Sequence, residues 1–352
     1  MPLDPLAHNR RLSIAPMLDW SDRHMRYLWR LLSKDVLLYS EMVVTHALIH
    51  AEPKRFLQYN ISEHPLALQL GGSDPSMLAL CARMAEDWGY DEVNLNCGCP
   101  SDRVQSGKFG ACLMGEAQLV ADCVSAMKAA VKIPITIKTR IGIDHQDSWE
   151  FVRNFVETVH GAGCDIFTIH ARKAWLKGLS PKENREKPPL NYNFAYRLKS
   201  EFPQLSISLN GGIKSLDAVS AILAGETTQG MTADRGGAVG ELVTVAPVAL
   251  DGVMIGREAY ENPWFLAQAD ERIFGRARSC PATEKELIEA FIPYLESQMA
   301  EGVPLHIMTK HLIGMFTGKR GARRYRQLMG EGACKPGANI ALVREAMAAV
   351  ED

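Results

Sequence analysis

The amino-acid sequence predicts a (β/α)8 TIM barrel followed by a small C-terminal helical-bundle domain. From residue 12 onward, short apolar runs of strand-forming residues alternate with amphipathic helical patterns. The alternation gives eight strand–helix units in about 260 residues, the usual size of such a barrel. Beyond about residue 262 only helical patterns follow. A doubly wound sheet is the alternative, but its G-x-G-x-x-G fingerprint does not follow the first predicted strand.

Several of the predicted strands are almost wholly apolar, as expected of parallel strands that helices cover on the outside. Amphipathic periodicity predicts the intervening helices, and Asp74-Pro75 and Ser215 supply residues that favour a helix start. The predicted strands are 12–15, 36–39, 66–70, 92–95, 135–138, 166–169, 206–209 and 252–255, and the clearest helices between them are 77–88, 117–130, 149–160 and 216–223.

Two domains are expected. Residues 1–262 form the barrel, and residues 225–248, rich in Gly, Thr and Val, are predicted to be an insertion on the face opposite the catalytic mouth. Residues 263–352 form the helical domain, with helices over 283–301, 305–316, 321–329 and 340–350. The centre of this domain is basic, which fits either a solvated helix face or a phosphate-binding surface. The basic residues are Lys310, Lys319, Arg320, Arg323, Arg324 and Arg326.

Composition and charge exclude several classes of protein. The formal net charge is −2, so any nucleic-acid surface must be a local patch. We expect no membrane association, because the sequence has neither a signal peptide nor an apolar run long enough to cross a bilayer. The eight cysteines follow no disulfide framework and no metal-ligand spacing. A reducing, cytoplasmic location, no bound metal and no obligate protein partner are therefore expected.

Polar and glycine-rich residues follow the predicted strands, where a barrel keeps its active site. Glycine-rich turns after the last two strands, at 210–212 and 256–257, are typical of a phosphate site because their bare N–H groups can bind an anion. Arg257 adds a charged donor. Lys138 and His170 end two other strands and would lie over the far end of the same ligand. This arrangement suits flavin mononucleotide (FMN), whose reduced ring carries negative charge.

The stretch 94–104, Asn-Leu-Asn-Cys-Gly-Cys-Pro-Ser-Asp-Arg-Val, places a thiol at the end of a strand. Gly98 permits close approach of a ligand, and Pro100 stiffens the segment that follows. Free cysteines are usually small buried hydrophobic residues, and we predict that Cys97 is one of them. The turn favours Cys99 as the reactive thiol. A long loop, residues 173–190, is predicted to act as a lid or to contact the substrate.

Together these stretches resemble the tRNA-dihydrouridine synthase family, and the resemblance extends over nearly the whole chain. Residues 179–186 (Leu-Ser-Pro-Lys-Glu-Asn-Arg-Glu) resemble the A type of the family in particular. The resemblance implies an FMN enzyme that uses NADPH to reduce uridine to 5,6-dihydrouridine at nucleotides 20 and 20a of the tRNA D-loop. The matching segments are 15–20 (Ala-Pro-Met-Leu-Asp-Trp), 69–72 (Gln-Leu-Gly-Gly), 94–104, 138–142 (Lys-Thr-Arg-Ile-Gly), 169–172 (Ile-His-Ala-Arg) and 210–212 (Asn-Gly-Gly).

The resemblance also implies residue roles. Cys99, the cysteine that precedes proline, would give a proton to uracil C5 while reduced FMN gives hydride to C6. The target base would have to leave its stack in the folded tRNA. The sequence departs from the family at Cys97, where an aliphatic residue is usual, and at the insertion 225–248. The implied FMN ligands are Pro16, Met17, Leu18, Gln69, Lys138, His170, Asn210, Gly211, Gly212, Gly256 and Arg257, and the implied tRNA contacts are Asn96, Lys182, Arg185, Arg323 and Arg326.

Two other functions remain open from the sequence. An FMN barrel reductase of a free pyrimidine or another small unsaturated carbonyl compound would need the barrel but not the basic helical domain. A catalytically silent tRNA-binding protein would need that domain but not the flavin residues. A bound flavin would exclude the silent tRNA-binding protein. A comparison of tRNA with free uridine as oxidant would distinguish the small-molecule reductase from a tRNA-reducing enzyme.

Overall fold

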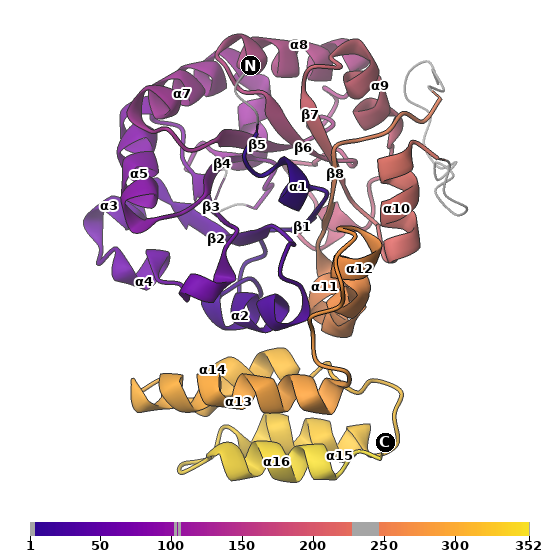
Figure 1. The fold of residues 1–352 in the computed structure, drawn as a ribbon. Helices are drawn as coiled ribbons and strands as arrows, with labels where there is room; N and C mark the ends of the chain where they lie inside the picture. The colour runs from indigo at the N-terminus through magenta and orange to yellow at the C-terminus, as the bar shows by residue number, and fades with distance from the viewer. Residues whose placement is uncertain (1–3, 102–103, 105–106, 227–245, 352) are drawn as a thin grey trace.

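The computed structural model describes residues 4–101, 104, 107–226 and 246–351. The predicted insertion at 225–248 falls largely outside this part, since residues 227–245 are not described. Figure 1 shows a ring of strands surrounded by helices, with a separate group of helices beside it. The strands are β1 (Leu12–Ile14), β2 (Leu38–Val44), β3 (Leu66–Gly71), β4 (Glu92–Cys97), β5 (Ile135–Arg140), β6 (Ile166–His170), β7 (Ser206–Asn210) and β8 (Gly252–Ile255).

The strands pair in parallel around a ring. Their order is β1-β8-β7-β6-β5-β4-β3-β2. Leu37, just before β2, closes the ring onto β1: Leu37 N donates to Leu12 O at 3.1 Å, and Ile14 N donates to Leu37 O at 3.0 Å. The predicted (β/α)8 barrel is therefore confirmed. The doubly wound alternative is excluded, because its sheet is open and its strand order reverses at a switch point.

The strand predicted at 36–39 is the least accurate. β2 begins at Leu38 and continues to Val44, and its pairing with β3 shifts between Tyr39 and Met42. The polar pair Ser40-Glu41 falls at this irregularity and interrupts the apolar run, so the sequence pattern hides the second half of the strand. The other predicted strands begin at the observed first residue and end within two residues of the observed end.

Helices cover the outer side of the ring (Figure 1). The expected N-caps are present: Asp74 Oδ1 accepts from Met77 N at 2.9 Å, and Ser215 Oγ accepts from Ala218 N at 3.2 Å. The helices are α1 (Ala7–Arg10), α2 (Arg23–Leu32), α3 (Thr45–His50), α4 (Lys54–Leu57), α5 (Pro75–Trp88), α7 (Ala117–Ala130), α8 (Trp149–Gly161), α9 (Asn193–Glu201), α10 (Leu216–Ala224) and α11 (Arg257–Glu261), with 3-10 turns η1 (Ile61–Glu63), η2 (Gly110–Gly115) and η3 (Glu183–Arg185).

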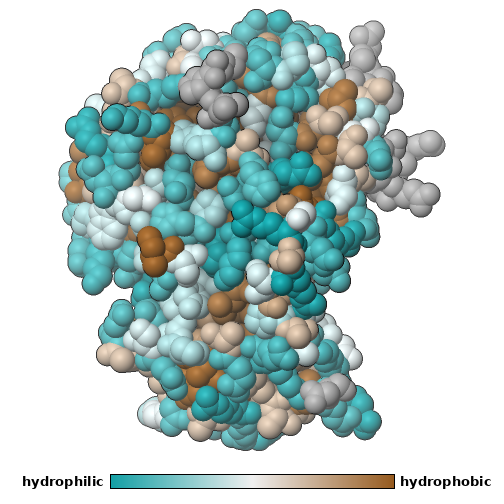
Figure 2. Space-filling view, viewed as in Figure 1, coloured by the Kyte–Doolittle hydropathy of each residue, from teal (hydrophilic) through white to brown (hydrophobic). Residues whose placement is uncertain are grey.

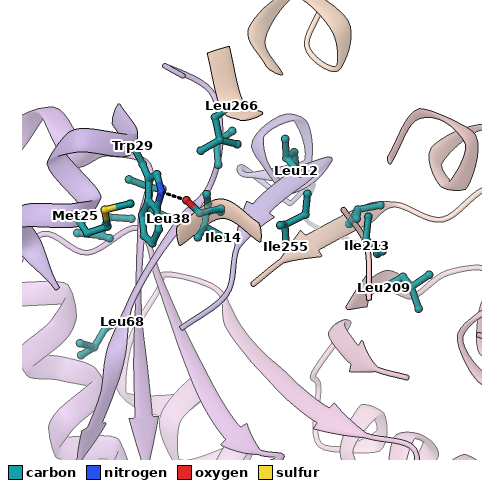
Figure 3. Packing of buried hydrophobic residues seen from close by; sticks show 14 of the residues in the cluster. Leu12, Ile14, Met25, Trp29, Leu38, Leu68, Leu209, Ile213, Ile255 and Leu266 are labelled. Carbon is teal, nitrogen blue, oxygen red and sulfur yellow. Dashed lines mark hydrogen bonds between the residues drawn. The ribbon is translucent and has the colours of Figure 1, made fainter. Parts of the chain in front are cut away.

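The packing of α2 shows how a helix is fixed to the barrel. Trp29 is fully enclosed beside Ile14 and Leu38, as Figure 3 shows. Its ring nitrogen Nε1 donates to the carbonyl oxygen of Ala259, in α11, at 2.7 Å. The indole therefore buries its apolar body and satisfies its one polar atom. Truncating a core tryptophan of this kind typically costs about 3–5 kcal/mol of stability.

The C-terminal helices follow a segment that still packs on the barrel. η4 (Pro263–Gln268) contacts α2, and α12 (Ala269–Arg272) contacts α10. The helix predicted over 305–316 is shorter than expected, because the chain tightens to a 3-10 turn at Lys310 and Phe316 takes φ +61°. The division at residue 262 stays a prediction. The remaining elements are α13 (Glu284–Ala300), α14 (Leu305–Thr309), η5 (Lys310–Leu312), α15 (Ala322–Gln327), the π-turn η6 (Leu328–Gly332) and α16 (Ile340–Ala348).

Asp22 joins the C-terminal helices to the barrel. Its Oδ1 caps α2 by accepting from His24 N at 3.0 Å and Met25 N at 3.1 Å. Its Oδ2 accepts from His311 Nε2 at 2.9 Å and Lys310 Nζ at 3.0 Å. Burial alone would raise the pKa of Asp22, but the bond to His311 and the charge of Lys310 outweigh it and hold that pKa well below its usual range.

The surface of the described residues is mixed. On the face shown in Figure 2, hydrophilic residues predominate and hydrophobic residues appear in small separate groups. Among the described residues, no helix combines the length and apolar character needed to cross a membrane.

Candidate active site

The carboxyl ends of the parallel strands meet on one face of the barrel, and predicted site residues gather there. Strand register places Asn96 of β4 opposite Lys138 of β5, and His170 of β6 opposite Asn210 of β7. Gln69 of β3 bonds to two residues of β4: its Nε2 donates to Asn94 Oδ1 at 2.8 Å, and its Oε1 accepts from Asn96 Nδ2 at 2.8 Å. Residues far apart in the sequence therefore form one continuous lining at this mouth.

Hydrogen bonds from several elements hold the loop that carries Cys99. Asn96 Oδ1 accepts from Gly98 N at 3.0 Å and from Cys99 N at 2.9 Å. Arg140 Nε donates to Gly98 O at 2.8 Å, and Ala111 N donates to Cys99 O at 2.8 Å. The backbone of Cys99 is thereby fixed at the mouth without help from its own side chain.

The two cysteines of this loop differ in environment. Cys99 is half-buried, and its Sγ lies 3.5 Å from Ser101 Oγ. Cys97 is fully buried, and this burial raises the pKa of its thiol well above the usual value. Both are free, like the other cysteines of the chain. Cys97 is thus a neutral core residue, and Cys99 is the thiol that borders the mouth.

The mouth concentrates positive charge beside Cys99. Lys138 Nζ donates to Asn210 Oδ1, a neutral partner, at 3.1 Å. Burial, and next the charge of Arg140, lower the pKa of Lys138 to about 7. Burial also lowers the pKa of His170 well below its usual value, and the charges of Arg140, Lys138, Arg172 and Arg185 lower it further. His170 is therefore neutral, and the basic groups around it make this part of the mouth a favourable place for an anionic ligand.

The turn after β7 requires glycine, both for its backbone angles and for close packing against neighbouring side chains. Gly211 has φ +123° and Gly212 has φ +71°, conformations that favour glycine. A Cβ on Gly211 would lie 3.0 Å from Leu190 and 3.1 Å from the His170 ring, and one on Gly212 would lie 2.6 Å from Leu190. Tyr192 further holds the turn by donating to Gly211 O. A side chain at either glycine would therefore push Leu190 out of its place against the turn.

The other predicted FMN residues lie on the same rim. Pro16 and Met17 are half-buried after β1, and Met17 N donates to Ser21 Oγ at 2.9 Å. Leu18 points outward, with 71% of its surface exposed.

At the end of β8, Gly256 precedes Arg257, the first residue of α11. Arg257 Nη1 pairs with Glu186 Oε1 at 2.7 Å. An exposed pair of this kind contributes about 0–1 kcal/mol, so a stronger anion could displace the carboxylate.

The loop at 173–190 is an ordered part of the site. Asn184 is fully buried; its Oδ1 accepts from Trp175 N at 2.8 Å and its Nδ2 donates to Trp175 O at 2.9 Å and Leu179 O at 3.2 Å. Arg140 Nη1 donates to Asn184 O at 3.0 Å. Because Arg140 also bonds Gly98, one guanidinium connects this loop to the Cys99 loop.

The predicted tRNA contacts fall into two kinds. Asn96 is only 9% exposed, and its side-chain oxygen accepts a hydrogen bond from the backbone of the Cys99 loop. Lys182, Arg185, Arg323 and Arg326 are exposed, and within the described part of the chain none makes an ion pair or a side-chain hydrogen bond. Neighbouring basic residues are paired instead: Lys187 with Glu183, Lys319 with Glu284, Arg320 with Glu351 and Arg324 with Glu345.

Sequence reasoning missed Arg140 and Asn184 as residues that organise the site. A signal for Arg140 was present, because it continues the inward alternation of Thr136 and Lys138 along β5. Asn184 gives no such signal, since its role depends on a loop conformation that periodicity does not describe. Among the described residues, no group of three or more His, Cys, Asp or Glu side chains is arranged to hold a metal ion.

An eight-stranded barrel with a fixed thiol and basic side chains at its carboxyl face has the architecture of a barrel enzyme. Comparison with solved structures agrees with the fold: a complex of 2-naphthoyl-CoA reductase with 2-naphthoyl-CoA matches with a TM-score of 0.53 at 13% identity, over 74% of this chain and 50% of that chain. At this identity the likeness concerns the fold alone.

Sequence comparison defines the family. The model described as "Dihydrouridine synthase (Dus)" matches residues 13–239 and 244–351. Proteins named tRNA-dihydrouridine(20/20a) synthase are 52% identical in Vibrio parahaemolyticus, over 98% of both chains, and 53% identical in Escherichia coli K12, over 97% of this chain and 92% of that one. The chain belongs to the dihydrouridine synthase family and is an oxidoreductase, as the resemblance predicted.

Proposed function

We propose that this protein reduces uridine to 5,6-dihydrouridine in tRNA, at nucleotides 20 and 20a of the D-loop, with FMN as cofactor and NADPH as reductant. The names of its relatives give the substrate class. The observation that carries the proposal is the mouth itself, where Cys99 lies among Lys138, Arg140 and His170. The test is reduction of unmodified tRNA by NADPH, with dihydrouridine mapped by position and free uridine as the comparison oxidant. Equal turnover of free uridine would favour the small-molecule reductase instead.

The residues present fit FMN. Gly211 and Gly212 form a tight turn with positive φ angles, and the bare N–H groups of such glycine turns can bind a phosphate. Lys138 has a neutral hydrogen-bond partner and would gain from a ligand with negative charge. When bound, reduced FMN supplies the hydride for uracil C6. The remaining predicted ligands, Pro16, Met17, Leu18, Gln69, His170, Asn210, Gly256 and Arg257, lie around the same rim or line the mouth.

Cys99 supplies the proton. A thiol is a suitable general acid for uracil C5, because it is ordinarily protonated at neutral pH and leaves only a thiolate behind. Lys138 and Arg140 lie close enough to Cys99 to interact with it electrostatically. The fixed backbone of the loop keeps the sulfur in one place while the base enters.

Exposed cations on two parts of the chain would hold the tRNA. Lys182 and Arg185 lie in the loop above the mouth, and Arg323 and Arg326 lie on α15. We propose that residues 263–352 form the tRNA-binding domain and residues 1–262 the FMN-binding domain. Phosphate contacts position the nucleic acid, and the target uridine must be extruded to reach Cys99. A cytoplasmic site of action accords with the free cysteines.

Gly211→Ala is expected to lower the FMN content of the purified protein severalfold. The new Cβ would press on Leu190 and His170, in addition to the strain of a positive φ. Gly178→Ala is the matched control, because Gly178 also has a positive φ, +85°, but a Cβ there meets nothing within 4 Å. Flavin absorbance per protein measures both. Equal FMN content in the two variants would contradict a ligand at this turn.

FMN binding is expected to weaken as the pH rises above about 7. Lys138 is charged below its lowered pKa of about 7 and neutral above it, so its attraction for an anion is lost on the alkaline side. For one proton the dissociation constant rises by up to about tenfold per pH unit. Titration with FMN from pH 6 to 9 measures this. In Lys138→Met the FMN dissociation constant is expected to lose this dependence on pH. An unchanged dependence would mean that a group other than Lys138 carries the charge that attracts FMN.

A further inference from the structure

A row of polar side chains descends through the interior of the barrel below the Cys99 loop. Strand β4 alternates Glu92, Asn94 and Asn96 with the apolar residues Val93, Leu95 and Cys97. Since alternate residues of a strand face opposite sides, the polar set lines the barrel interior. Glu92 and Asn94 are fully buried and Asn96 is 9% exposed. Neither Glu92 nor Asn94 has a place in the chemistry described so far.

These residues form one unbroken chain of hydrogen bonds with two residues of neighbouring strands. Thr136 Oγ1 donates to Glu92 Oε1 at 2.6 Å, and Asn94 Nδ2 donates to Thr136 Oγ1 at 2.8 Å. Gln69 Nε2 donates to Asn94 Oδ1 at 2.8 Å, and Asn96 Nδ2 donates to Gln69 Oε1 at 2.8 Å. Every bond in this chain therefore points downward, toward Glu92.

The lower end fixes that direction. A carboxylate can only accept, so the Thr136 hydroxyl must donate its single proton to Glu92 and accept from Asn94 with its oxygen. Glu92 Oε2 also accepts from Arg10 Nη2 at 2.7 Å, and Glu92 Oε1 accepts from Tyr39 OH at 2.8 Å. Burial lowers the pKa of Arg10, but the charge of Glu92 and the hydrogen bond to Asp4 outweigh it and raise that pKa well above its usual value.

The upper end requires the same direction independently. The backbone N–H groups of Gly98 and Cys99 can only donate, so Asn96 must present its oxygen to them and its amide nitrogen to Gln69. An acceptor at the floor and two donors at the mouth thus leave Asn94, Gln69 and Asn96 one orientation each. A reversed amide anywhere in the chain would set two donors or two acceptors against each other in a buried site.

We propose that Glu92 and Thr136 are positioning residues for the reaction: they orient Gln69 and Asn96, and through Asn96 they hold the Cys99 loop in its productive geometry. This proposal rests on the proposed function, because it assigns Cys99 as the proton donor and Gln69 as an FMN ligand. Neither Glu92 nor Thr136 touches the reacting atoms. Their effect passes through three side-chain amides, and the alternative is that they serve only to fill the barrel floor.

Thr136→Val removes the hydroxyl while it preserves the shape of the side chain, and Thr136→Ser restores the hydroxyl. In the full-length, FMN-loaded protein, Thr136→Val is expected to slow oxidation of the reduced flavin by tRNA about tenfold or more, the lower range for loss of an outer hydrogen-bond partner at metal sites. Reduction of the flavin by NADPH is expected to stay within about twofold, since it needs no proton from Cys99. Thr136→Ser is expected to resemble wild type.

Thr139→Val is the matched control. Thr139 is buried on the same strand but faces the opposite side, and its hydroxyl bonds Cys97 O at 3.4 Å, outside the chain. The flavin absorption spectrum gives a second readout, which is expected to shift in Thr136→Val alone because the Gln69 amide loses its fixed orientation. Glu92→Gln is expected to shift it too, since one of the two oxygens that accept from Arg10 and Thr136 becomes an NH2 group, which can only donate.

The outcomes separate the two proposals. Equal slowing of both half-reactions in Thr136→Val, without rescue by serine, or rates equal to wild type, would overturn the positioning role. If wild-type protein fails to use tRNA at all, the proposed function falls. The chain of hydrogen bonds is then judged by the flavin spectrum: a shift in Thr136→Val that Thr136→Ser reverses supports it, and identical spectra overturn it.

Discussion

Replacing Cys99 with alanine is expected to slow reduction of tRNA at least about a hundredfold, the usual scale for loss of a general acid. Reduction of the bound flavin by NADPH should be unaffected, because that step needs no proton from this thiol. The loop itself should survive the change, since its contacts to Asn96, Arg140 and Ala111 are made by backbone atoms of Gly98 and Cys99. Stopped-flow measurement of the two half-reactions tests this directly.

Cys97→Ala is the control for that experiment. Its thiol is enclosed among core residues and has a pKa raised by burial, so it is protonated but cannot reach a substrate. The expected result is a modest loss of stability from a small cavity, with little change in either rate. A larger rate loss in Cys97→Ala than in Cys99→Ala would show that the wrong cysteine has been assigned.

Replacing Arg323 and Arg326 with alanine is expected to weaken tRNA binding and to flatten its salt dependence. Both side chains are exposed on α15 and have no acidic partner among the described residues, so they are available for phosphates. Each lost phosphate contact should reduce the slope of log affinity against log salt by roughly one unit. Titration of unmodified tRNA across a salt series measures the slope. FMN content should not change.

The matched control is the double variant Arg320→Ala and Arg324→Ala. It removes the same charge from the same region, but Arg320 pairs with Glu351 and Arg324 pairs with Glu345. Its effect on tRNA affinity is expected to be smaller, because those guanidinium groups are already engaged with carboxylates. Equal losses in the two double variants would mean that overall charge, and not the free pair, attracts the tRNA.

The barrel could be predicted from the sequence because apolar strands and capped helices leave a local periodic signal. The same signal predicted that Cys99, Lys138 and Asn210 lie at one mouth of the barrel, since each ends or follows a strand and parallel strands bring their carboxyl ends together. β2 was misplaced because Ser40 and Glu41 break the pattern at an irregular pairing.

The supporting contacts could not be predicted in this way. Arg140 joins Gly98 to Asn184 across residues more than forty positions apart, and such a bond depends on loop conformation. The same holds for the ion pair of Arg257 with Glu186, which the sequence does not indicate; the predicted role of Arg257 as a phosphate donor stays a prediction. The polar alternation along β4 was visible in the sequence, but its meaning required the neighbouring strands.

The shared carboxylate of Asp22 has a consequence for engineering. One oxygen of Asp22 starts α2 of the barrel, and the other is held by Lys310 and His311 of the C-terminal helices. A chimaera that exchanges those helices between relatives would therefore alter a barrel helix unless all three residues travel together. The C-terminal helices therefore cannot be exchanged independently of the barrel at the contact of Asp22 with Lys310 and His311.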